Sequence, residues 1–238
     1  IQVSFSTFNR GLWKMNGNKF ENIGFYKYTS CSYQAVSAIW LSIGGPTVEI
    51  KDNIIINTKW AGVLTVGFGS NSPSISNGGI SVVNNTIEKT VDAGIQIGFP
   101  TDAFFYPSNA LIQGNYIKEA NTSNKVGIGA ITMLFSDLAA TRILNNHITQ
   151  SYNGLAIEIA GWRAKSDTTI VRYNNFCNLS GGFAVTHIAG ISPNGTYGTG
   201  DDLANYKFDN NYWGDPSGPK YTATNPSGLG QRLRKDTI

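Results

Sequence analysis

The chain has few charged residues for its length. Lys, Arg, Asp and Glu make up 14% of its 238 residues, and the net charge is +3. A nucleic-acid-binding domain concentrates Lys and Arg on one face, whereas the nearest basic cluster here is the short run 232–235. The composition argues against a nucleic-acid partner. It also leaves Asn, Ser, Thr, Gly and aromatic residues to form most of the surface.

Cysteine, histidine and methionine are scarce as well, with two residues of each. Cys31 and Cys177 cannot form a disulfide framework, and so few soft ligands disfavour a copper site. No run of 18 apolar residues is present, so we expect no membrane insertion. The sequence opens without Met or a cleavable signal, and we interpret it as a mature protein or an excised domain.

What the chain does contain is a hexapeptide pattern, apolar-x-x-Asn-x-apolar, that occurs seven times. The copies are MNGNKF (15–20), IKDNII (50–55), VVNNTI (82–87), IQGNYI (112–117), ILNNHI (143–148), VRYNNF (171–176) and FDNNYW (208–213). A period of about 30 residues is typical of solenoids, in which each coil buries its apolar face against its neighbours. The repeated asparagines are predicted to form a hydrogen-bonded ladder at one corner, where Asn also tolerates left-handed backbone. They are Asn18, Asn53, Asn85, Asn115, Asn146, Asn174 and Asn211.

A second element follows most copies: a small residue and then alternating apolar residues. It occurs as SAIWLS (37–42), AGVLTV (61–66), AGIQIG (93–98), GIGAITM (127–133), NGLAIEIAG (153–161) and GGFAVTHIAG (181–190). Such alternation indicates a half-buried strand, and no segment sustains the period of a helix. The sequence therefore predicts an all-β solenoid.

The repeats and the ending NNYWGDPSGPKYTATNPSGLG (210–230) resemble the right-handed parallel β-helix superfamily. This group includes pectate-lyase-like, carbohydrate-binding and sugar-hydrolase domains, and the resemblance covers about residues 15–230. In that family the Asn-Asn-Tyr-Trp-Gly segment closes the last coil. Tyr212 and Trp213 are suited to covering that end, and Pro216 and Pro219 to stopping further strand pairing. The fold hosts many chemistries, and signature motifs of polygalacturonases, alginate epimerases and pectate lyases are missing.

We therefore predict one right-handed, single-stranded parallel β-helix domain over residues 1–238, with about seven coils. Residues 1–14 are expected to form an N-terminal cap or incoming coil, and residues 214–238 a C-terminal cap or tail. Trp13, Phe25 and Tyr26 are candidates for covering the N-terminal end. His147 is expected to point outward on its own.

The outward faces of the alternating strands offer a binding surface. Because strand side chains alternate between faces, we expect an outward line through Trp40, Thr65, Gln96, Glu158 and Thr186. Trp60, Trp162 and Tyr106, of the loop AFFYP (103–107), lie in neighbouring turns. Flat aromatic rings at such a surface are suited to stacking on pyranose sugars, although some of them are equally suited to capping an end.

Catalysis at this surface needs more than one group. Glu158 with Asp137 is the carboxylate pair that a glycoside hydrolase would use, whereas a polysaccharide lyase would use Lys165 and Arg163. The alternative is that Glu158 is an outward, solvated residue that discourages strand aggregation. Asp201 and Asp202, in GTGDD (198–202), form either a calcium loop or an ordinary turn, and no other cofactor is expected.

The sequence thus favours an extracellular or cell-surface protein that binds an extended polysaccharide, as a monomer or as part of a larger chain. A second hypothesis is a glycoside hydrolase or polysaccharide lyase that uses the same face. A third is a structural, adhesin or surface-layer module in which the β-helix is only a spacer.

Overall fold

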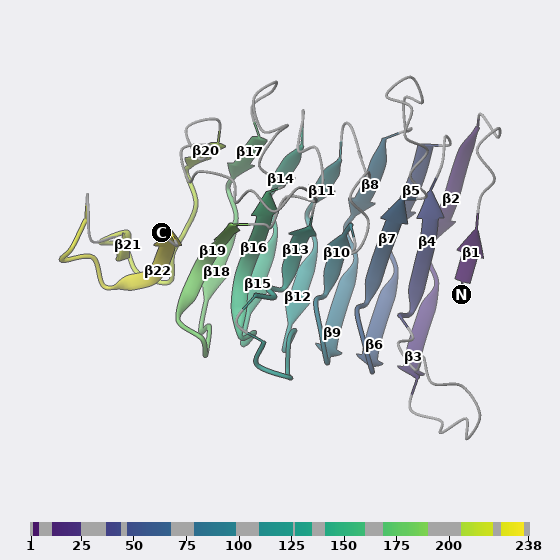
Figure 1. Cartoon of the computed structure of the whole chain (residues 1–238), viewed down its shortest axis with the longest axis horizontal. Coiled ribbons are helices and arrows are strands. Elements are labelled where there is room, and N and C mark those ends of the chain that lie inside the picture. Colours follow the sequence, from purple (N-terminus) through teal and green to yellow (C-terminus); the bar gives the residue numbers. More distant parts are fainter. Residues whose placement is uncertain are drawn as a thin grey trace.

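The computed structural model describes residues 2–4, 11–24, 37–43, 47–67, 79–98, 110–125, 127–134, 141–159, 169–189, 206–220 and 225–235. Every regular element in these ranges is a β-strand. The strands lie side by side along one long axis, from the N-terminal to the C-terminal end (Figure 1).

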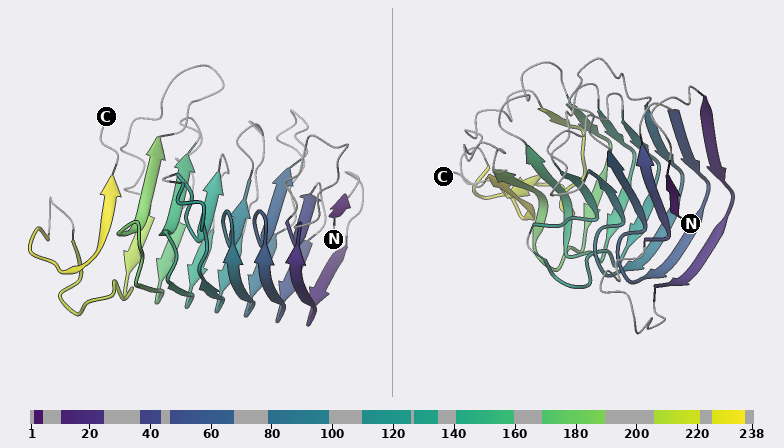
Figure 2. Two further views of the ribbon diagram at one scale, coloured as in Figure 1. Left: turned by 90° about the horizontal axis from the view of Figure 1, so that it is seen from below. Right: turned by 45° about the vertical axis from the view of Figure 1, so that its right-hand side comes forward.

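Three parallel sheets form the walls of the solenoid (Figures 1 and 2). Sheet A has nine strands in the order β1 (Gln2–Ser4), β4 (Ile39–Ile43), β7 (Val63–Gly67), β10 (Ile95–Ile97), β13 (Ile131–Leu134), β16 (Asn153–Ile159), β19 (Phe183–Ala189), β22 (Gly230–Lys235) and β21 (Pro219–Lys220). Sheet B has seven: β2 (Leu12–Asn16), β5 (Thr47–Lys51), β8 (Ile80–Val83), β11 (Leu111–Gln113), β14 (Arg142–Leu144), β17 (Thr169–Arg172) and β20 (Tyr206–Asp209). Sheet C has six: β3 (Lys19–Ile23), β6 (Ile54–Thr58), β9 (Thr86–Thr90), β12 (Tyr116–Lys118), β15 (His147–Thr149) and β18 (Asn175–Cys177).

The chain visits sheets A, B and C in turn, which confirms the predicted β-solenoid. Six coils supply a strand to every sheet, slightly fewer than the predicted seven. The next coil is partial, because after β19 and β20 it reaches sheet C only through an isolated bridge between Asn175 and Tyr212.

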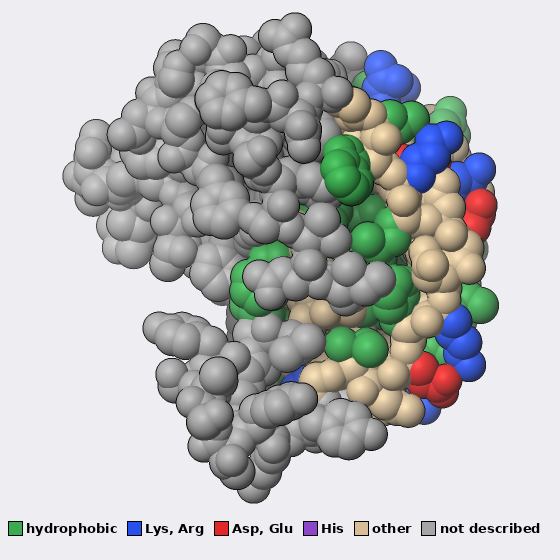
Figure 3. Space-filling model, turned by 90° about the vertical axis from the view of Figure 1, so that its right-hand side faces the viewer, with side chains coloured by type: hydrophobic (Ala, Val, Ile, Leu, Met, Phe, Trp, Pro, Cys, Tyr) green, Lys and Arg blue, Asp and Glu red, His purple; other side chains and the backbone are tan. Residues whose placement is uncertain are grey.

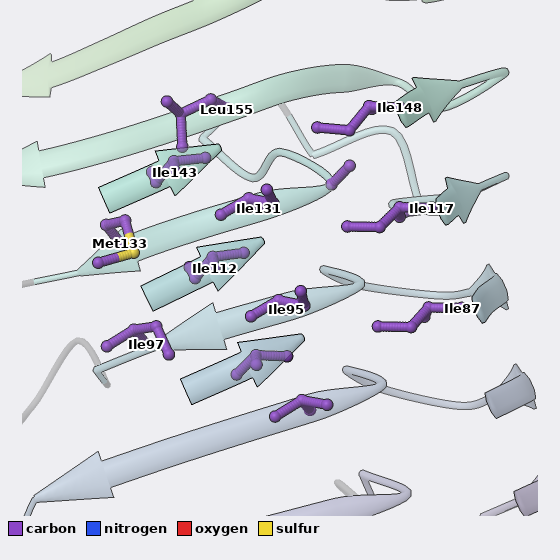
Figure 4. Close-up of a cluster of buried hydrophobic side chains, with 14 of the residues drawn as sticks. Ile87, Ile95, Ile97, Ile112, Ile117, Ile131, Met133, Ile143, Ile148 and Leu155 are labelled. Carbon is purple, nitrogen blue, oxygen red and sulfur yellow. The ribbon is translucent and has the colours of Figure 1, made fainter. Parts of the chain in front are cut away.

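The hexapeptide repeat supplies two columns of the core. Its first apolar residue faces inward from sheet B and its last from sheet C, and each pairs in register with its equivalent in the next coil. The sheet B column is Met15, Ile50, Val82, Ile112, Ile143, Val171 and Phe208. The sheet C column is Phe20, Ile55, Ile87, Ile117, Ile148 and Phe176, continued by Trp213, which stacks on Phe176 with ring centroids 5.3 Å apart. Figure 4 shows this regular stacking of aliphatic side chains.

The seven asparagines form the predicted ladder at the corner between sheets B and C. The side-chain Nδ2 of each of the first six donates to the Oδ1 of the next Asn, at 2.9–3.1 Å throughout. The backbone N–H of the same residue donates to that Oδ1 as well, as in Asn85 to Asn115 at 2.9 Å. Nδ2 also donates to a carbonyl of the preceding coil, such as that of Ile50. In each buried carboxamide the Nδ2 group therefore donates hydrogen bonds and the Oδ1 atom accepts them. Burial of a polar group requires such partners.

The left-handed backbone at this corner lies one residue earlier than expected. In every copy the residue before the ladder Asn has a positive φ, between 54° at Asn84 and 68° at Gly17. The ladder Asn itself is therefore selected for its side chain. A second left-handed position occurs four residues after the ladder Asn in six coils: Asn22, Asn57, Lys89, Glu119, Gln150 and Asn178.

The small residue that starts each sheet A strand is explained by close packing at the corner between sheets C and A. Ala38, Gly62, Gly94, Ala130, Gly154 and Ala184 occupy this position in successive coils. A Cβ at Gly154 would lie 2.4 Å from the carbonyl oxygen of Ala184 and 2.6 Å from the Phe176 ring. The backbone of the next coil therefore leaves almost no room for a side chain.

Residues 211–235 close the C-terminal end. Both Tyr212 and Trp213 were predicted to cover the end of the core. Trp213 does so and is buried, whereas Tyr212 is 45% exposed. Asp215 accepts hydrogen bonds from the Ser217 hydroxyl and backbone N–H, and Asn225 donates to Ser217 and Pro219 carbonyls. The Pro-containing strand β21 lies outside β22 and ends sheet A, because proline is a poor partner for a further strand.

Candidate functional site

The three corners of the coil differ in how much chain they hold. Between sheets B and C every connection is two residues, such as 52–53 or 145–146. Between sheets A and B the connections run from the short 44–46 to 68–79 and 190–205. The ladder explains this contrast, because an insertion at the B–C corner would move a buried Asn out of register. Insertions are tolerated where no ladder constrains the backbone, and functional residues concentrate in such loops.

Most predicted site residues belong to these A–B connections. Tyr106 lies between β10 and β11, Asp137 between β13 and β14, and Asp201 and Asp202 between β19 and β20. Trp162, Arg163 and Lys165 lie between β16 and β17. All seven fall outside the described residues. What the structure does show is that the sheet A strands before these connections run parallel and end at the same edge of the sheet.

The register of sheet A corrects the predicted outward line. The paired residues are Trp40, Leu64, Gln96, Thr132, Ala156 and Thr186. Thr65 instead pairs with Leu41 and Ile97 and is buried in an inward column. Alternation along one strand fixes which residues share a face, but only inter-strand pairing fixes which residues align.

Glu158 lies two residues beyond Ala156 on the same strand. Its backbone pairs with Leu134 in the preceding coil and Ile188 in the following one. The Glu158 side chain is outside the description. The backbone register nevertheless places position 158 next to Leu134, the last residue of β13. Asp137 follows Leu134 by three residues in the sequence.

Trp40 and Trp60 form an aromatic pair on the outer side of the coil. Their ring centroids are 5.7 Å apart with ring planes at 89°, an edge-to-face arrangement, and both rings are partly buried against Ala61 and Leu64. Within the described part of the chain no acceptor reaches the buried Nε1 of Trp40. The pair is thus an aromatic cluster held against the outer side of sheet A, and the buried Nε1 of Trp40 has no hydrogen-bond acceptor among the described residues.

The other described members of the outer line are buried. Gln96 is 3% exposed, and its Nε2 donates to the carbonyl of Gly98 at 3.1 Å. Thr132 donates to the Gly129 carbonyl, whereas the hydroxyl of Thr186 has no hydrogen-bond partner in the described residues. The outer column from Trp40 to Thr186 is therefore largely buried, and Trp40 is the one member that is partly exposed.

Sheet C carries a second outward column that sequence reasoning did not identify. His147 is not alone: it stacks on Tyr116, with ring centroids 5.4 Å apart and planes at 18°, and its Nδ1 lies 3.1 Å from Nδ2 of Asn175. Tyr212 pairs with Asn175 in the next coil. Each of these four residues directly follows a ladder Asn, so aligning the seven copies would have revealed the column.

A charged cluster lies at the corner between sheets C and A. The carboxylate of Asp92 is 5% exposed and contacts Lys125 Nζ at 2.6 Å. Ser123 donates to Asp92, and Asn121 holds the loop by donating to the carbonyls of Lys125 and Ile128. With its carboxylate already paired, Asp92 stabilises a loop and is no free acid or base.

Metal-ligating side chains do not gather in the described ranges, where no group of three or more His, Cys, Asp or Glu residues occurs. Cys177 is a free thiol, and Cys31 lies outside the description. None of the described elements is a helix long and apolar enough to cross a membrane.

Comparison with known proteins gives no relative from which a site could be transferred. No family model, no curated protein and no solved structure matches the chain.

Proposed function

We propose that this protein is an extracellular or cell-surface β-helix that binds an extended polysaccharide along the A–B corner and the adjoining outer face of sheet A. The observation that carries the proposal is the contrast between the corners. The B–C corner never varies, whereas the A–B connections vary in length and contain Tyr106, Trp162 and the charged residues expected of a glycan site.

The geometry of the solenoid favours a long ligand over a compact one. Successive coils rise by about 4.8 Å, and their A–B connections leave from one edge of a parallel sheet. The points at which consecutive connections leave sheet A therefore form a row parallel to the solenoid axis. A linear polymer can contact such a row over several coils, which a small metabolite cannot.

The Trp40–Trp60 pair supports a sugar as the repeating unit of that polymer. Aromatic rings anchored at a surface are preferred elements of binding sites, and a partly buried ring loses little conformational freedom when a ligand stacks on it. Trp40 and Trp60 are both only partly buried, so part of each residue remains accessible for stacking.

Affinity electrophoresis through gels that contain glucans, pectins or alginates tests the proposal. The native protein should be retarded by at least one polymer. Trp162→Ala and Trp40→Ala should each weaken the binding by about 10-fold or more, as expected for aromatic anchors. Tyr212→Ala is the matched control because this exposed aromatic residue lies on sheet C.

Circular dichroism establishes that the variants keep the β-helix. Absence of retardation in every gel would refute polysaccharide binding and leave the spacer function as the better hypothesis. Equal losses in Trp40→Ala, Trp162→Ala and Tyr212→Ala would refute the proposed face.

A second candidate function is polysaccharide cleavage, and the backbone register of Glu158 favours it. Pairing of Glu158 with Leu134 brings its strand next to the one that leads to Asp137. Two carboxylates about 5–10 Å apart are what hydrolysis requires. A polysaccharide lyase would depend instead on Arg163 and Lys165.

The cleavage assay measures reducing ends and the absorbance of unsaturated uronates over the same polymers. A hydrolase should lose turnover in Glu158→Gln while still binding polymer. A lyase should lose uronate absorbance in Lys165→Met. Polymers that stay intact with the native protein would exclude both activities for that panel.

A further inference from the structure

The basic run 232–235 belongs to a strand of sheet A. It forms most of β22, which pairs in parallel with β19 on one side and β21 on the other. Leu233 packs against the core, so the alternation of the strand places positions 232 and 234 on its outer face. The backbone of Arg234 pairs with Thr186, the final residue of the outer column, and thus continues that column.

Two cations are neighbours at this end of sheet A. We define the cationic patch as Lys220 of β21 and Arg232 of β22, which pair in register and are both exposed. Like charges on directly opposite residues destabilise a sheet. Among the described residues no carboxylate forms an ion pair with either cation. The acid that precedes them in the sequence, Asp215, accepts hydrogen bonds from Ser217 instead.

Other parts of the described surface mix both signs of charge. Figure 3 looks onto the opposite end of the solenoid, where basic and acidic side chains lie next to each other along the rim. In the first two coils Lys19 pairs with Glu21 at 2.8 Å and Lys51 with Asp52 at 3.7 Å. The cationic patch differs from these surfaces because its cross-strand neighbours have the same sign.

The guanidinium group of Arg232 is held in place by its surroundings. Its Cζ lies 4.9 Å from the centroid of the Phe183 ring, which is a cation–π contact. A Cβ at Gly182 would lie 3.2 Å from a guanidinium nitrogen, so the glycine leaves room for the group. A bulge in each pairing, with one extra residue in β19 and one in β22, brings Phe183, Arg232 and Lys220 into line. Bulges often re-aim side chains beside functional sites.

We propose that the cationic patch binds acidic groups of an extended polysaccharide, which makes the ligand of this protein an anionic glycan. The proposal rests on the proposed function, because β22 belongs to the sheet from whose edge the A–B connections leave. A polymer that follows this edge along the solenoid axis reaches β22 directly after β19. There Arg232 and Lys220 donate charge-assisted hydrogen bonds to its carboxylate or sulfate oxygens, and such bonds are stronger than neutral ones.

A polysaccharide fits this patch better than a nucleic acid does. A nucleic-acid site spreads Lys and Arg over a whole face or along an element. Here two described cations lie at the end of a sheet whose outer column, from Trp40 to Thr186, contains no charged residue. That arrangement suits a ligand with both uncharged and acidic parts.

Beads of one polymer in three charge states test the proposal: neutral dextran, carboxymethyl-dextran and dextran sulfate. The full-length protein should bind at least one of the charged beads more tightly than the neutral ones. Added NaCl should remove the difference, because salt screens exposed charges. Comparison of the two charged beads distinguishes carboxylate from sulfate as the preferred group.

Matched variants isolate the patch. Lys220→Gln and Arg232→Gln should each weaken binding to the charged beads about 10-fold, because each loses a charge-assisted hydrogen bond. Arg232→Lys keeps the charge and should retain most of the binding. Arg142→Gln is the control, since it removes the same charge from an exposed position on sheet B. Circular dichroism shows whether each variant keeps the β-helix.

The outcomes separate this proposal from the function on which it rests. Binding to charged dextrans that is no tighter than to neutral dextran would overturn the proposal, yet retardation in a glucan gel would still support polysaccharide binding. An equal loss in Arg142→Gln would also overturn it, because net charge and not the patch would then explain the binding. Duplex DNA that binds more tightly than either charged dextran, and more weakly to Lys220→Gln, would make a nucleic acid the partner.

Discussion

The ladder asparagines show how one side chain can determine the position of a whole coil. Asn115 donates to Val82 of the preceding coil and to Asn146 of the following one, each at 2.9 Å, and accepts from Asn85. Each carboxamide therefore connects three coils. Because these groups are buried, water cannot replace a partner that is lost.

Replacing Asn115 with Ala should lower the free energy of unfolding by about 3 kcal/mol, because it leaves the donors of Asn85 and the carbonyl of Val82 without partners. Asn18→Ala is the control, since the same carboxamide at the exposed end of the ladder should contribute less than about 1 kcal/mol. Urea denaturation of both variants measures the difference. Equal losses of stability in the two variants would mean that burial does not determine how much each ladder carboxamide contributes.

Tyr173 occupies the left-handed corner position that other coils fill with Gly, Asn or Asp. Its φ of 58° is unfavourable for a residue with a bulky Cβ substituent, and its ring is 58% exposed, so little packing compensates. Tyr173→Asn should therefore stabilise the protein by about 1 kcal/mol. Thermal unfolding measures the effect. Tyr212→Asn, at an exposed tyrosine without a positive φ, should show no increase in stability. A gain of equal size at both sites would contradict the backbone explanation.

At the scale of strands and turns, the sequence allowed one part of the coil to be predicted better than another. The B–C arch was predictable because its apolar residues and Asn keep the same spacing within all seven copies of the hexapeptide, which was enough to give the ladder and two core columns. Sheet A was predicted as strands, but Thr65 was placed on the outer face although alternation puts it on the inward face with Val63. The alignment of Leu64, Thr132 and Ala156 with the outer residues needed the inter-strand register, which alternation does not give. The A–B and C–A connections differ in length and sequence from coil to coil, so no periodic pattern indicates how they fold.

The C-terminal turn is sensitive to acid. Hydrogen bonds from the Ser217 side chain, and then from its backbone N–H, lower the pKa of Asp215 from the usual 3.8. A carboxylate whose pKa is lower in the folded state stabilises the fold above its unfolded pKa, and that contribution is lost as the pH falls through the folded pKa. The melting temperature of Asp215→Ala should therefore lie below that of the native protein at pH 7. The difference between the two melting temperatures should become smaller below about pH 4, where the carboxylate of Asp215 begins to be protonated.

Amide hydrogen exchange of Ser217 gives a local measurement of the same effect. Its protection should fall in Asp215→Ala at neutral pH, while that of ladder residues stays constant. A melting-temperature gap that does not change with pH would show that Asp215 acts through packing and not through its charge.

At the scale of the whole molecule, the solenoid divides its tasks among its corners. The B–C corner holds the coils in register with two-residue connections, whereas the A–B connections vary in length. The C–A connections vary too, from 150–152 to 24–38, but each leads to a position where close packing favours Gly or Ala. This division allows the A–B connections to change in length without moving the ladder, because the ladder lies at a different corner.

Insertion of the same Gly-Ser-Gly segment at two corners tests this division directly. Between Asn145 and Asn146 the segment should prevent cooperative folding, since it displaces buried Asn146 from Asn115 and Asn174 and takes the following strand out of register. Within residues 135–140 it should cost no more than about 1 kcal/mol, because lengthening a surface loop adds little closure entropy. Urea denaturation and far-ultraviolet circular dichroism distinguish the two outcomes. If both insertions destabilise equally, the A–B corner is as constrained as the ladder corner, and the variation in its length has no bearing on where a ligand binds.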